Sequence, residues 1–115
     1  MARILVVDDE PIIAMTVADW LIDLGHVALG PAANLASALA WLDGEIDAAI
    51  LDVTLGAQTT AQVAALLTQK GKPFAVVTGH DPDSLAAAFA PGLILPKPFG
   101  YESFRCLVKR LLRDR

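Results

Sequence analysis

Short apolar runs alternate along the chain with segments in which apolar residues recur at helical spacing. Five runs are short and continuous enough to be strands buried on both faces. These runs are residues 4–7, 27–29, 48–51, 74–77 and 93–95. The pattern therefore predicts a sheet whose strands are covered on both sides.

Helical segments separate these runs. Pro11 suits the first turn of a helix, Gly25 ends that helix, and Asn34 offers a side-chain oxygen to cap the next one. The predicted helices span about residues 11–24, 35–42, 60–69, 84–89 and 101–113. Alternating strands and helices with short loops predict right-handed crossovers, a parallel sheet and helices on both of its faces. We expect one doubly wound α/β domain over residues 1–115.

Composition narrows the class of protein. A chain of 115 residues with 55% hydrophobic residues can bury a core, yet it has no apolar stretch of the roughly 20 residues that cross a bilayer. We expect a soluble protein without a signal peptide or membrane contact.

Cys106 is the single cysteine, so no intrachain disulfide forms, and a reducing cytoplasm is the simplest location. We expect its thiol to be packed beside Phe104 and Leu107. The net charge of −4 argues against direct nucleic-acid binding.

Polar side chains follow four of the predicted strands. They are Asp8 and Asp9, Asp52, Thr78, and Lys97. In an open α/β sheet the carboxyl ends of the strands border the functional crevice, so these groups are expected to meet there. Carboxylates brought together repel one another unless a cation shares the site, and oxygen ligands alone favour Mg2+ over zinc. A hydroxyl and an ammonium beside them suit the transfer of a phosphoryl group to a carboxylate.

These residues in this order give a resemblance to a known family. The chain resembles, over its whole length, a response-regulator receiver domain of two-component signalling, the CheY-like family. An acidic pair after the first strand, an Asp after the third, a Ser or Thr after the fourth and a Lys-Pro after the fifth carry the resemblance. It implies a flavodoxin-like, five-stranded parallel sheet with strand order 2-1-3-4-5.

The resemblance also implies a role for each site residue. Asp52 would be the phosphoacceptor and, with Asp9, a Mg2+ ligand. Asp8 would act through metal-bound water, and the backbone carbonyl of Thr54 would complete the metal site. Thr78 would be the switch hydroxyl, and Lys97 would pair with the phosphoryl group. The chain would be a phosphoacceptor rather than an enzyme acting on other substrates.

Two positions of this sequence differ from the usual receiver pattern, and one segment indicates a subfamily. Ile94 stands three positions before Lys97, where many receivers have an aromatic residue. The Met-Pro that usually follows the phosphoacceptor is also absent, and Thr54-Leu55-Gly56-Ala57 stands in its place. Residues 73–80 are similar to the Phe-Ala-Thr-Gly motif of stand-alone alphaproteobacterial receivers, which are often linked to HWE-type histidine kinases. In that subfamily Gly79 and the loop through residue 82 would carry the switch.

The resemblance implies partners as well. A histidine kinase or a histidine phosphotransferase would donate the phosphoryl group after docking on the first helix near Ile12 and Ile13. Output would be a protein contact with an unknown downstream partner, from a monomer or weak homodimer. His80 and His26 are interpreted as loop residues without a catalytic role.

Two other functions remain open. One is a Mg2+-dependent phosphatase that passes through an aspartyl-phosphate, which would want an acid where Thr54 stands. The other is a receiver-like interaction module that no longer accepts phosphate. The absence of an aromatic residue at Ile94 is the one feature that favours it. Turnover of phosphate esters would separate the first from a receiver.

Overall fold

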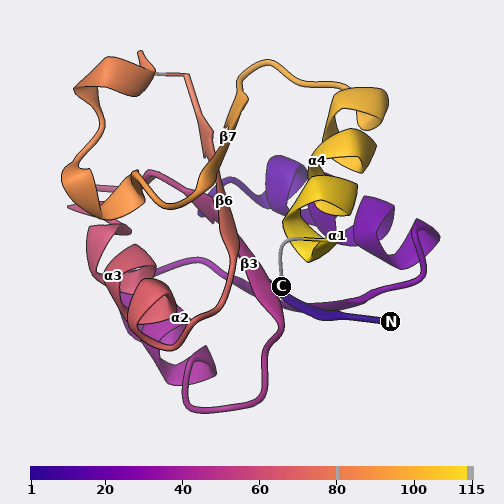
Figure 1. Cartoon of the computed structure of the whole chain (residues 1–115), viewed down its shortest axis with the longest axis horizontal. Helices are drawn as coiled ribbons and strands as arrows, with labels where there is room; N and C mark the ends of the chain where they lie inside the picture. Colours follow the sequence, from indigo (N-terminus) through magenta and orange to yellow (C-terminus); the bar gives the residue numbers. More distant parts are fainter. Residues whose placement is uncertain (80, 114–115) are drawn as a thin grey trace.

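Five parallel strands form a sheet between two layers of helices (Figure 1). The computed structural model describes residues 1–79 and 81–113, so His80 lies outside the described residues. The strands of this sheet are β1 (Arg3–Val7), β2 (Val27–Ala32), β3 (Ala48–Asp52), β6 (Phe74–Thr78) and β7 (Leu93–Pro96). The helices are α1 (Pro11–Asp23), α2 (Leu35–Trp41), α3 (Ala61–Gln69) and α4 (Tyr101–Arg113). Helices α1 and α4 lie on one side of the sheet, and α2 and α3 lie on the other (Figure 1).

The strands lie in the order β2-β1-β3-β6-β7, and every neighbouring pair is parallel. Counted among these five strands, the order is 2-1-3-4-5, so the predicted flavodoxin-like fold is confirmed. The chain reverses direction across the sheet between β2 and β3. In folds of this kind, that reversal places a crevice beyond the carboxyl ends of β1 and β3.

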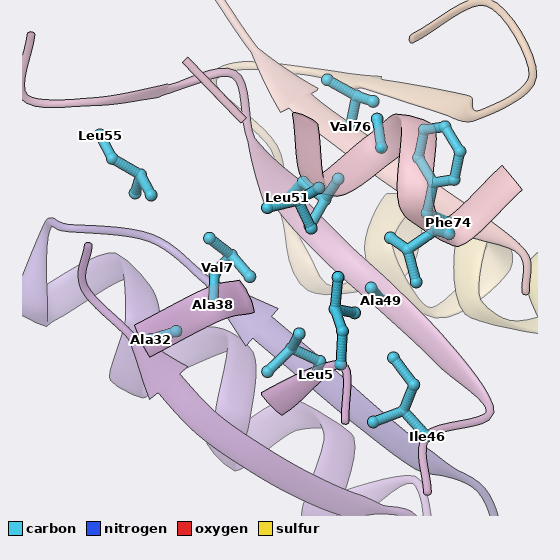
Figure 2. Close-up of a cluster of buried hydrophobic side chains, with 14 of the residues drawn as sticks. Leu5, Val7, Ala32, Ala38, Ile46, Ala49, Leu51, Leu55, Phe74 and Val76 are labelled. Carbon is cyan, nitrogen blue, oxygen red and sulfur yellow. The ribbon is translucent and has the colours of Figure 1, made fainter. Parts of the chain in front are cut away.

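Successive residues of the central strands enter opposite cores. Leu5 and Val7 of β1 pack toward α2 and α3, whereas Ile4 and Val6 pack toward α1 and α4. Strands β3 and β6 alternate in the same way, since the side chains of a strand point to its two faces in turn. Figure 2 shows the first of these cores, with side chains from β1, β3 and β6 meeting in one cluster. Burial on both faces explains why the strand sequences are continuously apolar.

One predicted helix is wrong. Residues 84–89 do not form an α-helix; two short 3-10 turns, η1 (Pro82–Ser84) and η2 (Ala87–Phe89), occupy this region. Both the backbone N–H and the hydroxyl of Ser84 donate to the carbonyl of Asp81, at 2.9 and 2.7 Å. Such local bonds compete with a regular helix, and a segment this short has few helical bonds with which to offset the cost of nucleation.

A small hairpin was not predicted. Strands β4 (Thr54–Leu55) and β5 (Gln58–Thr59) pair antiparallel directly after β3. Gly56 lies in the turn between them with a φ of +61°, a conformation that glycine adopts readily. Strands of two residues are too short to give a periodic pattern in the sequence.

The expected packing of Cys106 is also wrong, because the thiol lies on the exposed face of α4. The buried face of this helix consists of Phe104, Leu107, Val108 and Leu111, which recur at three- and four-residue spacing. Cys106 falls between these positions.

Within residues 1–79 and 81–113, no helix is both long and apolar enough to cross a membrane.

We expect Gly30→Ala to destabilise the fold more than Gly71→Ala. Both glycines have positive φ, +93° and +71°, so alanine costs about 1–2 kcal/mol at either position. At Gly30 the added Cβ would also lie 2.7 Å from the backbone N of Ala32 and 3.1 Å from the carbonyl O of Val6, whereas at Gly71 it meets nothing within 4 Å. Overpacking of this kind adds at least about 1 kcal/mol. Urea denaturation measures both losses, and equal losses would contradict the clash.

Candidate functional site

The polar residues expected to meet do lie at one edge of the sheet. Asp8 follows β1, Asp52 ends β3, Thr78 ends β6 and Lys97 follows β7. In the register of these strands Asp52 is paired with Val77, and Thr78 with Pro96. Because the strands are parallel neighbours, their carboxyl ends bring an acid, a hydroxyl and an amine to the same crevice.

Asp52 and Lys97 are in direct contact. Lys97 Nζ lies 3.4 Å from Oδ2 of Asp52, whose side chain is 8% exposed. The backbone N–H of Lys97 donates to the carbonyl of Thr78 at 2.8 Å, which ties the end of β6 to the residue that carries the amine. Thr78 itself is buried. The structure therefore brings together three of the residues singled out in the sequence.

A third acid beside Asp8 and Asp52 was not predicted. The carboxylate oxygens of Asp8, Glu10 and Asp52 lie within 4.8 Å of one another. Asp8 is held in place because its Oδ1 accepts the backbone N–H of Glu10 at 2.9 Å. Glu10 immediately precedes α1 and is exposed. Its position next to the acidic pair was visible in the sequence, but the direction of its side chain was not.

Burial raises the pKa of Asp8 from its ordinary value of 3.8 to about 6. The residue is 6% exposed, so its charged form loses most of its hydration. The negative charge of Asp52 raises the pKa further, while the hydrogen bond from the N–H of Glu10 and the charge of Lys97 lower it. Asp8 is therefore an acid that a nearby cation would keep ionised at neutral pH.

Asp9 is not one of the described acids whose oxygens cluster, and Thr54 begins the hairpin that follows β3. Oδ2 of Asp9 accepts the backbone N–H of Gly56 at 2.8 Å, so its carboxylate is bonded to the turn between β4 and β5. Thr54 is exposed at the start of β4, two residues after Asp52. Both residues are thus connected to the hairpin of β4 and β5, Asp9 by this hydrogen bond and Thr54 as part of β4. Their roles as metal ligands stay predictions.

Thr60 is a buried residue of the site that sequence reasoning missed. Its hydroxyl donates to the backbone carbonyl of Asp52 at 2.6 Å, and its backbone N–H donates to the carbonyl of Val53 at 2.9 Å. These bonds fix the main chain at the end of β3 against the start of α3. A threonine before a helix is expected to cap it, and the sequence carried no signal for the longer-range bond.

The donor set fits a hard divalent cation such as Mg2+. All the clustered side chains offer carboxylate oxygens, which are the ligands that Mg2+ prefers. Burial is the main cause of the raised pKa of Asp8, and repulsion by the charge of Asp52 adds to it. A cation held among Asp8, Glu10 and Asp52 would offset this repulsion.

An apolar groove of about 450 Å3 borders the site between α1 and the segment after β7. It is lined by Ile12, Ile13, Thr16, Trp20, Lys97, Pro98 and Phe99. The indole of Trp20 also packs against Tyr101 and Phe104, with ring centroids 5.5 Å apart in each case. Ile12 is 82% exposed at the rim. An apolar surface thus continues directly from Lys97.

Comparison with solved structures agrees with this fold. The chain is similar to SdrG from Sphingomonas melonis Fr1, with 39% identity, a TM-score of 0.83 and 97% of each chain covered. It is also similar to the BeF3-activated conformation of SdrG from Pseudomonas melonis Fr1 (40% identity, TM-score 0.79, 96% of this chain and 95% of that one). TrrA from Thermotoga maritima in complex with Mg2+-BeF is 28% identical, with a TM-score of 0.84 over 97% of this chain and 100% of that one.

No protein-family model matches the chain, and no curated protein matches it. The sheet order defines a flavodoxin-like fold with polar residues at the carboxyl ends of its strands, and the chain is 39% identical to SdrG over 97% of its length. The chain belongs to the response-regulator receiver domains of two-component signalling.

We expect Asp8→Asn to stabilise the metal-free protein at pH 7. A carboxyl group whose pKa is raised on folding favours the folded state below about pH 4, and this contribution is lost as the pH rises through about 6. Relative to Asp19→Asn, which changes an exposed acid on α1, the substitution should gain up to about 3 kcal/mol at pH 7 and little at pH 4. Urea denaturation at both pH values, with a chelator present, measures the difference. An equal effect at pH 4 and pH 7 would be inconsistent with a raised pKa.

Proposed function

We propose that this chain is a phosphoacceptor of a two-component phosphorelay, and that Asp52 receives the phosphoryl group from a phosphohistidine. The observation that carries the proposal is the contact of Lys97 Nζ with Asp52 Oδ2 at 3.4 Å, beside two further carboxylates. A buried carboxylate with an amine on one side and a cation-binding group on the other suits phosphoryl transfer. The donor is a histidine kinase, which the similarity to the Phe-Ala-Thr-Gly subfamily suggests is of the HWE type, or a histidine phosphotransferase.

In the proposed reaction an Asp52 oxygen attacks phosphorus, an O–P bond forms, and the N–P bond to the donor imidazole breaks. The electron pair of that bond returns to the imidazole nitrogen. The ammonium of Lys97 offsets charge on a phosphoryl oxygen, and the hydroxyl of Thr78 donates a hydrogen bond to another. Asp8, Asp9, Asp52 and the carbonyl of Thr54 are the proposed metal ligands. Bound Mg2+ supplies further charge neutralisation.

The proposed output is a change in protein contact rather than catalysis on another substrate. Thr78 and Lys97 are joined by a backbone hydrogen bond, so attraction of either group to the phosphoryl oxygens would move the ends of β6 and β7 together. Ile94 stands in β7 where an aromatic switch is common, and Gly79 with the following loop would transmit the change instead. The downstream partner, a monomeric or weakly dimeric state and a cytoplasmic location stay predictions.

Acetyl phosphate or phosphoramidate should phosphorylate the protein once. Intact mass spectrometry after incubation with Mg2+ should show one added phosphoryl group, which is absent from Asp52→Asn and from a sample with excess chelator. Phosphorylation of Asp52→Asn to the same extent would assign the phosphoryl group to another residue. No addition to folded wild-type protein with several donors would favour the interaction module that does not accept phosphate.

Ile12→Ala should slow phosphotransfer from a histidine kinase or phosphotransferase about tenfold, because the side chain is 82% exposed at the groove beside Lys97. Ile22→Ala is the matched control, since Ile22 is 58% exposed on the same helix but lies about 15 Å along its axis. Phosphorylation by acetyl phosphate should be unchanged in both variants. Equal slowing with the protein donor and the small donor would argue against a docking surface here.

A further inference from the structure

Among the described residues, two carboxylates lie within 4 Å of the Lys97 amine. Its Nζ lies 3.4 Å from Oδ2 of Asp52 and 3.8 Å from Oε1 of Glu10. The two acids differ in exposure, since the side chain of Asp52 is 8% exposed and that of Glu10 is 60% exposed. The amine therefore lies between the buried floor of the site and its solvent-exposed rim.

The main chain of Glu10 is fixed, so this neighbour is placed by the fold. Its backbone N–H donates to Oδ1 of Asp8 at 2.9 Å, and its carbonyl accepts the N–H of Ala14 at 2.9 Å. Glu10 is the N-cap residue of α1, with extended backbone angles, and Pro11 follows it. The start of α1 thus directs one long acidic side chain toward Lys97.

A second partner for Lys97 matters when a metal ion arrives. The ammonium and a divalent cation repel each other, and both are attracted to the oxygens of Asp52. Without Glu10, the acids near the ammonium would be Asp52 and Asp8, and both belong to the proposed metal site. Metal binding would then leave the ammonium without a negative partner of its own. Glu10 offers such a partner at the rim.

We propose that Glu10 is a positioning residue that holds Lys97 toward the rim and thereby frees Asp52 for a metal ion. This inference rests on the metal site of the proposed function and concerns the regulation of its affinity. Glu10 lies outside the residues that the family resemblance assigns to the site. It acts through Lys97, so its effect on Mg2+ affinity depends on that amine.

A simpler electrostatic effect has to be separated from this one. Glu10 also adds negative charge near the metal site, because its oxygens lie within 4.8 Å of those of Asp8 and Asp52. That direct attraction does not require Lys97. A double-mutant cycle between Glu10→Gln and Lys97→Gln distinguishes the two effects.

The experiment is a titration of the full chain with MgCl2 at constant ionic strength, followed by backbone amide NMR. We expect Glu10→Gln to raise the Mg2+ dissociation constant about two- to fivefold, the size of effect that an exposed ion pair produces. In the Lys97→Gln background the same substitution should change it by less than about 1.5-fold. Glu45→Gln is the control for net charge, since Glu45 is exposed and precedes β3 at the opposite end of the strand.

Each outcome decides a separate point. A loss on Glu10→Gln that disappears without Lys97 supports the positioning role. An equal loss in both backgrounds, or no loss in wild type, overturns it while leaving the metal site in place. Wild-type protein that shows no Mg2+-dependent shifts at millimolar concentrations overturns the proposed metal site, and this inference fails with it.

Discussion

Burial of both faces of β1, β3 and β6 is the constraint on which the rest of the structure depends. Their side chains alternate between two cores, so a polar residue within these strands would lose its hydration on either face. Polar groups are tolerated only where the strands end. Because the strands are parallel, those ends meet at one edge, and the position of Asp52 follows from packing as much as from chemistry.

The packing energy of the sheet maintains an arrangement of charges that is unfavourable by itself. Three carboxylates lie within 4.8 Å of one another, and one ammonium, that of Lys97, contacts two of them. Burial, together with the charge of Asp52, raises the pKa of Asp8 to about 6. A site with excess negative charge and fixed geometry attracts a cation without having to rearrange, which lowers the cost of binding.

The sequence predicted what depends on long apolar runs and on residues at their ends. All five strands of the main sheet and the meeting of Asp52 with Lys97 followed from these features. Contacts decided by tertiary geometry were not predictable. Asp9 bonds a turn 47 residues away, and Glu10 joins the acids only through the direction of α1. The prediction of a helix at residues 84–89 was wrong. Over so short a segment, the spacing of apolar residues does not distinguish one α-helix from two 3-10 turns.

The aromatic cluster around Trp20 gives the protein a built-in optical probe. This indole lines the groove beside Lys97 and contacts the rings of Tyr101 and Phe104. The other tryptophan, Trp41, ends α2 on the opposite side of the sheet and is 36% exposed. The two indoles therefore have different surroundings. A molecule bound in the groove would change the surroundings of Trp20 and leave those of Trp41 unchanged.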